Sequence, residues 1–316
     1  MELNQNEFLA SLFNLIIQTR VNRTVNGQRI NELIDACMVD PIEYGEGAGL
    51  ISVDTLETED YSKTSSLLTN KEATLDEQQL ETTDKKLIHV TINRYLMKGA
   101  FKDEYSMSEC IGTITEMLEK TKLIYVYKKI VSAYQNWSPT LATQVVEIEL
   151  TDGTGMVGAE LNENNKANAL AIYSKVRELS LNLQSPSRDY NDLEYEEMYN
   201  ANEMDFIVNG KFDSLINTHA YASLLNSDKL NNIQLYDKSI IIPKKQFSTP
   251  EAQEFTIGYL VSKKKYMIAP RFTVSASFFD ASNLNDQEFL HFWLNSAFVN
   301  GLAGIKLVAK FVAPEA

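Results

Sequence analysis

The residues of this chain that could perform chemistry are few and far apart. Its three histidines, His89, His219 and His291, stand in three different segments, and none has a partner at the spacing of a metal site. The motifs GxSxG, HExxH and CxxC do not occur in the sequence. We therefore expect structural roles for the histidines, and we expect neither a catalytic residue nor a metal ion.

A glycine-rich segment and several carboxylates also admit a chemical interpretation. Residues 153–155 read Gly-Thr-Gly and Gly158 follows, which weakly resembles a phosphate-binding loop. The segment lacks the GxxxxGK[ST] order and precedes no capped helix, so a turn is the simpler interpretation. The carboxylates of Asp152 and Glu160, and the acidic run at 194–197, are most economically explained as solvated surface. We expect no cofactor.

The run Lys263-Lys264-Lys265 forms a cationic cluster between two strand-like segments. A charged β-turn is the first interpretation, and a contact with phosphate or with an acidic patch on a neighbouring subunit is the alternative. Changing all three lysines to serine separates the two. A turn predicts nearly unchanged stability, because exposed charges contribute little, whereas an interface predicts weaker assembly.

Composition excludes several classes of protein. The chain has 316 residues, 44% of them hydrophobic and 23% charged, as in soluble globular proteins. Its 29 basic and 43 acidic residues give a formal net charge of -14, which argues against sequence-specific binding of nucleic acid. No apolar run approaches the roughly 20 residues of a membrane span, and the N-terminus lacks the pattern of a signal peptide. Cys37 and Cys110 form no disulfide or metal pattern, so a reducing cytoplasm is expected.

The longest regular pattern covers residues 105–137. Apolar residues recur there at helical spacing and Pro139 follows the segment. Ser106 and Glu109 have the spacing of a capping box at its start. The pattern predicts one helix of about 45 Å at 1.5 Å per residue, long enough to run across the molecule as a spine. The β-branched and aromatic run at 124–127 favours helix least, and any break is expected there.

A long polar segment stands between two strand-like segments near 50–55 and 87–92. Residues 57–84 are rich in Thr, Ser, Asp, Glu and Gln and offer little apolar surface. We expect these strands to bracket an extended hairpin arm that leaves the body of the protein. Such an arm could not offset the entropy of its own ordering and would need a surface on a neighbouring subunit.

The rest of the chain mixes helices and strands and ends in a β-rich region, so we expect an α+β fold. Helical patterns occur at 6–38, 168–183 and 213–225. Strand patterns occur at 144–150, 206–210, 240–243, 256–261, 266–278, 289–293 and 305–311.

This order of elements resembles that of tailed-bacteriophage major capsid proteins, the Hong Kong 97-type capsid fold, which encapsulins share. The resemblance covers roughly residues 40–312. It rests on the stretch 204–212 (MDFIVNGKF) and on the tail from Tyr266, where 268–272 (IAPRF) leads to 289–293 (FLHFW). Within this family the chain is most similar to the capsid proteins of small short-tailed phages.

The resemblance implies four parts. An N-terminal arm would occupy 1–46 and an extended β-hairpin loop over a neighbouring subunit would occupy 47–104. A peripheral domain with the spine helix would comprise 105–160 and 255–316, and an axial domain at 161–254 would gather around five- and six-fold axes. Candidate subunit-interface residues are Leu67, Leu68, Leu75, Leu80, Lys263, Lys264 and Lys265.

The resemblance also implies partners and a location. The chain would assemble with itself as pentamers and hexamers into an icosahedral or prolate head. The head would enclose double-stranded DNA without sequence-specific binding, with scaffold and portal proteins as further partners and no membrane. Assembly would take place in the host cytoplasm, and the finished protein would reside in the virion.

Two other classes remain open at this point. A connector or tail subunit would also be β-rich and lack catalytic residues, but it would form rings of fixed number. A metabolic enzyme or ligand-binding α/β protein would need a pocket with convergent polar groups, and the sequence names none.

Overall fold

The computed structural model describes residues 28–41, 48–56, 58, 72–80, 82–93, 104–151, 163–216, 240–242, 254–283 and 285–312. The chain divides into two compact units. The first unit comprises residues 1–48, 79–130 and 267–297. The second unit comprises residues 49–78, 131–266 and 298–316.

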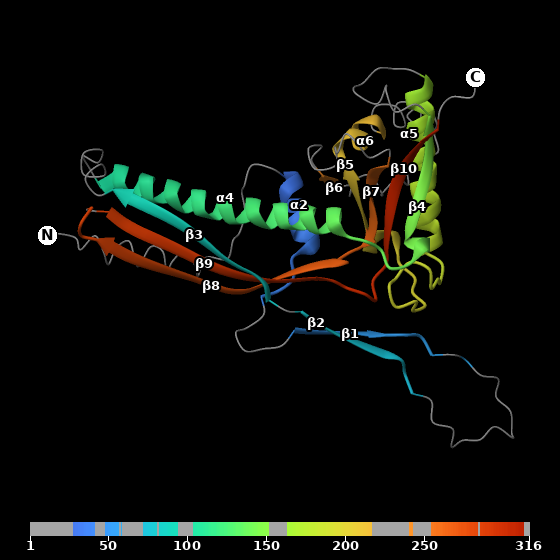
Figure 1. The fold of residues 1–316 in the computed structure, drawn as a ribbon, viewed down its shortest axis with the longest axis horizontal. Coiled ribbons are helices and arrows are strands. Elements are labelled where there is room, and N and C mark those ends of the chain that lie inside the picture. Colours follow the sequence, from blue (N-terminus) through green and yellow to red (C-terminus); the bar gives the residue numbers. More distant parts are fainter. Residues whose placement is uncertain are drawn as a thin grey trace. The chain divides into compact units, whose positions relative to one another are not determined.

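The described elements mix helices and strands along the whole chain (Figure 1). The helices are α2 (Gln28–Cys37), α4 (Glu104–Asn136), α5 (Glu163–Leu183) and α6 (Gly210–Leu215), with short 3-10 turns at Ala142–Gln144 and Ala201–Glu203. The strands are β1 (Ala48–Val53), β2 (Leu75–Leu80), β3 (Thr82–Asn93), β4 (Val145–Thr151), β5 (Met204–Asn209), β6 (Ile240–Ile242), β7 (Glu254–Ser262), β8 (Tyr266–Asp280), β9 (Asn285–Phe298) and β10 (Gly304–Val312).

In the first unit, α4 lies along one face of a three-stranded sheet with the order β3-β9-β8 (Figure 1). β3 and β9 run antiparallel, and their even-numbered residues face the helix. Leu290 of β9 packs on Leu118 of α4 in a small buried cluster. Asp84 of β3 pairs with Lys129 of α4 at 2.6 Å. Because strand side chains alternate, the odd-numbered residues of both strands lie on the opposite face.

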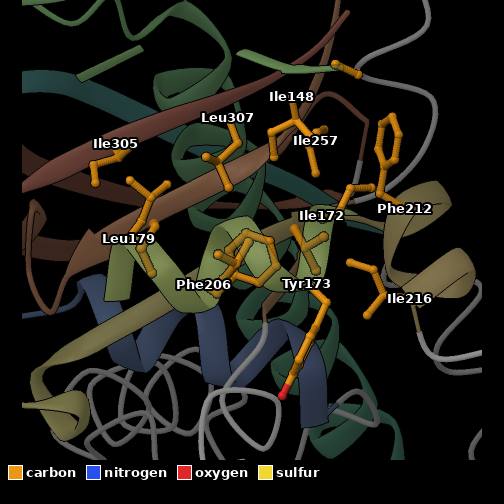
Figure 2. Packing of buried hydrophobic residues seen from close by; sticks show 14 of the residues in the cluster. Ile148, Ile172, Tyr173, Leu179, Phe206, Phe212, Ile216, Ile257, Ile305 and Leu307 are labelled. Carbon is orange, nitrogen blue, oxygen red and sulfur yellow. The ribbon is translucent and has the colours of Figure 1, made fainter. Parts of the chain in front are cut away.

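The second unit is built on a five-stranded sheet with the order β4-β10-β7-β5-β6. β10 runs parallel to β4 and antiparallel to β7, which pairs in turn with β5. The side chains of α5 and α6 pack on this sheet and close one continuous hydrophobic core (Figure 2). Every residue of β5 is buried, and three consecutive residues at its centre, 206–208, are apolar.

One glycine of this sheet is required by close packing. A Cβ atom at Gly258 of β7 would lie 2.4 Å from the backbone oxygen of Ile207 and 3.0 Å from the Cα atom of Val208. Both contacts are with backbone, which cannot rotate aside. The pairing of β7 with β5 therefore depends on the missing side chain.

Most of the expected elements are confirmed. The spine is a single helix of 33 residues that continues through 124–127 and starts at Glu104, two residues before the expected cap Ser106. It ends at Asn136, ahead of Pro139. The strands and the helix expected between 144 and 210 are present, as are all four C-terminal strands. The segments 6–27 and 217–225, for which we expected helix, lie outside the described residues.

The expected pairing of the arm is wrong. The strand at 87–92 is part of β3 and pairs with β9 in the first unit, so it does not pair with the strand near 50–55. The partner of β1 is β2, which lies within the segment that we expected to be a polar excursion. Periodicity identifies a strand but not its partner, and the nearer strand closes the shorter loop at a lower entropic cost.

The compact units also divide the chain differently from the segments that the resemblance implied. β4, β7 and β10, which fell in the expected peripheral domain, share one sheet with β5 and β6 of the expected axial domain and one core with β5. The spine helix and the β3-β9-β8 sheet form the first unit without them, apart from the last residues of α4.

Candidate assembly surfaces and the base of the arm

The described residues that could perform chemistry do not form one site. His89 and His291 are exposed on the three-stranded sheet, whereas His219 and the glycine segment at 153–155 lie outside the described residues. In the part of the chain that the structure describes, no three His, Cys, Asp or Glu side chains are grouped so that they could hold a metal ion. None of the described helices is both long enough and apolar enough to cross a membrane.

The three lysines at 263–265 have different environments. Lys263 and Lys264 are exposed in the tight turn between β7 and β8, where Lys264 adopts a φ of 64°. The backbone N–H of Lys265 donates to Ser262 O at 3.1 Å and closes the turn. The side chain of Lys265 is fully buried, so this residue cannot meet a neighbour's acidic patch and must be removed from the interface candidates.

The Lys265 ammonium group is fully satisfied inside the second unit. It donates to Asp192 Oδ2 at 2.8 Å, to Val299 O at 3.0 Å and to Leu302 O at 2.7 Å. Burial lowers the pKa of Lys265, and the hydrogen bond and charge of Asp192 partly offset that effect. Asp192 also accepts a hydrogen bond from Gln144 Nε2 at 3.0 Å. The turn between β9 and β10 is thus held to the interior by a buried cation.

The four candidate leucines have different environments. Leu67 and Leu68 lie outside the described residues. Leu75 is 63% exposed on β2 and is available for a contact, whereas Leu80 is 6% exposed, and its backbone oxygen accepts a hydrogen bond from Asn295 Nδ2. Leu80 therefore packs within its own subunit, and the prediction is corrected for this residue.

We use the term arm for residues 48–80, whose described part is the β1-β2 pair and its flanks. Four apolar side chains of the arm are open to solvent: Ile51 is 70% exposed, Val53 50%, Leu56 69% and Leu75 63%. Its sequence is acidic, with two lysines against seven carboxylates, at Asp54, Glu57, Glu59, Asp60, Glu72, Asp76 and Glu77. Exposed apolar side chains in such a group mark an interaction surface.

The three-stranded sheet of the first unit presents a second apolar surface, which we call the open sheet face. It consists of the odd-numbered side chains of 85–91 and 287–293 and the even-numbered side chains of 272–278. Aromatic contacts tie the three strands together: Trp293 lies 4.9 Å from Phe272 between ring centroids, and Phe289 stacks on His89 at 4.5 Å. Leu87 is 49% exposed and Phe278 is 65% exposed.

The charge of the open sheet face is opposite to that of the arm. Its charged or titratable side chains in these stretches are Lys85, His89 and His291, and no carboxylate stands among them. Lys85 Nζ lies 4.8 Å from the centre of the Trp293 ring, a cation–π contact. An acidic, apolar partner would complement this face.

The base of the arm is tied to the second unit from both strands. On the β1 side, Asp54 accepts hydrogen bonds from the backbone N–H of Glu196 at 3.0 Å and from Arg188 Nη1 at 3.2 Å. These donors lower the pKa of Asp54, that of Glu196 most, so the carboxylate is ionised at neutral pH. On the β2 side, Gln78 donates to Phe298 O at 2.6 Å and accepts from the backbone N–H of Asn300 at 3.1 Å.

These contacts at the base of the arm were missed in the sequence. Asp54, Gln78 and Arg188 are polar residues without periodicity or motif, and their partners are about 130 to 220 positions away. One signal was available: the Asn300-Gly301 dipeptide between two strand patterns marks a tight turn. It identifies the turn but not the arm that the turn holds.

Solved structures with the same fold come from phage particles. The capsid structure of Staphylococcus phage Andhra has a TM-score of 0.65 at 10% identity, over 93% of this chain and 90% of that chain. A structure described as the head fiber and inner core protein gp22 of native bacteriophage P68 has a TM-score of 0.59 at 12% identity, over 91% and 87%. The capsid structure of Cyanophage P-SCSP1u gives 0.55 at 13% identity, over 95% and 94%. The expected capsid fold is confirmed.

The chain matches a protein family but no individual curated sequence. No curated protein sequence matches the chain. The profile of the Phi29-like phage major capsid proteins matches residues 1–301, which is nearly the whole chain. The chain therefore belongs to the Phi29-like phage major capsid protein family.

Proposed function

We propose that this major capsid protein builds its shell by placing the arm of one copy on the open sheet face of the next. Membership of the family makes the chain a capsid component of the virion that associates with itself. One observation supports the proposed contact: the described residues carry two apolar, exposed surfaces, one acidic and the other cationic. A contact between copies buries both.

Physical chemistry favours this contact over a contact of the arm with the spine helix of the neighbouring copy. Among the side chains of α4 that the structure describes, Leu118, Val126 and Ile130 are already buried. Leu87, Val274 and Phe278 of the open sheet face remain exposed. Burial of apolar area contributes about 25 cal/mol per Å², so the uncovered face offers the larger gain.

The finer features of the shell remain part of the proposal. Copies form pentamers and hexamers in a closed icosahedral or prolate head. The head encloses double-stranded DNA without sequence-specific contacts, and the net charge of -14 supports weak adhesion to that DNA. Scaffold and portal proteins assist in the host cytoplasm. A connector or tail subunit, the alternative from the sequence, is not favoured by the family.

Disulfide trapping tests the contact. A particle assembled from equal amounts of the Leu75→Cys and Leu87→Cys variants and then oxidised is expected to give linked dimers on a non-reducing gel. Leu181→Cys is the matched control partner for Leu75→Cys, because Leu181 is 55% exposed on α5 and is not part of the open sheet face. Equal linkage of both pairs would contradict the proposed surface, and wild-type protein that forms no particle by electron microscopy would contradict shell formation itself.

A further inference from the structure

The turn between β9 and β10 fits against β1 with no room for a side chain. A Cβ atom at Gly301 would lie 2.4 Å from Ser52 Oγ and 2.7 Å from Ser52 Cβ. The next contact, with Leu193 Cδ1, is an ordinary 3.6 Å. The φ of Gly301 lies outside the left-handed range, so close approach to the arm is what requires glycine here.

This steric contact lies between the two polar contacts at the base of the arm. Asp54 holds β1 through Glu196 and Arg188, and Gln78 holds β2 through the backbone of the same 298–301 turn. We call these three contacts, at Asp54, Gln78 and Ser52–Gly301, the arm clamp. All of them belong to the second unit, so they form within one copy of the chain.

Buried polar groups stabilise the two segments that the arm clamp contacts. The Asp192 backbone N–H donates to Asn300 O at 3.0 Å, and Lys265 holds the neighbouring oxygens of Val299 and Leu302. Asp192 itself bonds Lys265 at 2.8 Å. The turn and the 188–196 segment are therefore connected by one polar network around a fully buried cation. This network keeps the turn and the 188–196 segment rigid, so both hold their positions when the arm moves.

We propose that the arm clamp fixes the direction in which the arm leaves its subunit, and that this direction sets the size and uniformity of the shell. The inference rests on the proposed function, because direction matters only if the arm engages a neighbour. An extended six-residue strand is about 20 Å long. A tilt of about 10° at its base moves its far end by about 3 Å, enough to shift packed side chains out of register.

Gly301→Ala is the sharpest perturbation of the clamp. The added methyl group enters the space of Ser52 Cβ, which belongs to the backbone frame of β1 and cannot rotate away. We expect amide exchange in 75–80 to accelerate on the order of tenfold. We also expect particles to change from one diameter to a broad range of sizes or to tubes in electron micrographs.

Ser52→Gly in the Gly301→Ala background is the matched rescue. It removes both close contacts and leaves only Leu193 Cδ1 at an ordinary distance. Exchange rates and particle diameter are therefore expected to return toward those of the wild type. Gln78→Ala tests the same clamp without entering the turn and is expected to reproduce the defect, should Gly301→Ala fail to fold. Ala73→Ser changes an exposed, uncharged position of the arm outside the clamp and is expected to change neither readout.

The outcomes separate the two proposals. Uniform particles and unchanged exchange in Gly301→Ala and Gln78→Ala would overturn the clamp, as would a defect that Ser52→Gly leaves untouched. If wild-type protein forms no particle, the proposed function fails. Amide exchange at 75–80 still tests the clamp in that case, because the contacts form within one copy.

Discussion

Lys265→Met removes the buried cation while keeping a side chain of similar length. In the wild type, the ammonium group satisfies one carboxylate oxygen of Asp192 and the backbone oxygens of Val299 and Leu302. Val299 O also accepts from the backbone N–H of Leu302 at 3.3 Å, so it retains a partner in the variant. Asp192 Oδ2 and Leu302 O lose the ammonium group, and the loss of the cation beside the Asp192 carboxylate is the larger effect.

The magnitude follows from the burial of the two partners. Breaking a buried ion pair from one side costs about 3–5 kcal/mol. The Asp192 side chain is 12% exposed and keeps its bond from Gln144, which places the cost near the lower end, at about 3 kcal/mol. At about 2–4 °C per kcal/mol, the melting temperature is expected to fall by about 6–12 °C.

Thermal unfolding followed by circular dichroism measures this loss. Lys263→Met is the matched control, because Lys263 is exposed in the same turn, and it is expected to stay within about 0.5 kcal/mol of the wild type. Adding Asp192→Asn to Lys265→Met should cost less than the sum of the two single changes, since no unpaired charge remains. Equal melting temperatures for Lys265→Met and Lys263→Met would refute this account of the cation.

Two further predictions concern the sheets of the two units. Burial and the neighbouring carboxylate of Asp286 raise the pKa of Glu288 from 4.5 to about 7. The folded state therefore favours the protonated form, and stability falls as pH rises from about 4.5 through about 7. Glu288→Gln should remove this dependence and at pH 8 should exceed the wild type by up to about 3 kcal/mol in chemical denaturation, whereas an unchanged pH profile would contradict it. Gly258→Ala should lower stability by more than about 2 kcal/mol in the same assay, because its Cβ would lie 2.4 Å from Ile207 O, and a neutral result would show that β5 and β7 can separate.

The helices and strands of this fold could be predicted from the sequence, but the pairing of the strands could not. The 33-residue helix and strands such as β5 have strong local patterns, which need no knowledge of the rest of the chain. The choice of β9 rather than β1 as the partner of β3 depends on contacts about 200 positions apart. Periodicity contains no information about such a choice.

The assembly residues were only partly accessible for a related reason. Leu75 was proposed as an interface residue because an apolar residue in a polar segment is conspicuous; the structure leaves it exposed, and its role in assembly stays a prediction. Lys265 was assigned to the surface with its two neighbours, because a run of lysines ordinarily stands in water. Its burial depends on Asp192, 73 residues away, and on the two carbonyl groups of the 299–302 turn. The burial of a charged side chain can be recognised only when the positions of its partners are known.

Different interactions hold the base of the arm and the proposed contact of the arm with the open sheet face, and this difference is useful in a shell. Hydrogen bonds at the base of the arm, through Asp54 and Gln78, are directional and hold one geometry. Apolar burial on the open sheet face is non-directional and does not by itself select one angle. An arm placed on the next copy makes a heterologous contact, which closes into a ring whose number depends on the angle between neighbours. Five-fold and six-fold rings differ in that angle by about 12°. We infer that the clamp, by holding the arm at one angle, limits which rings can form, so that a loosened clamp gives particles of many sizes.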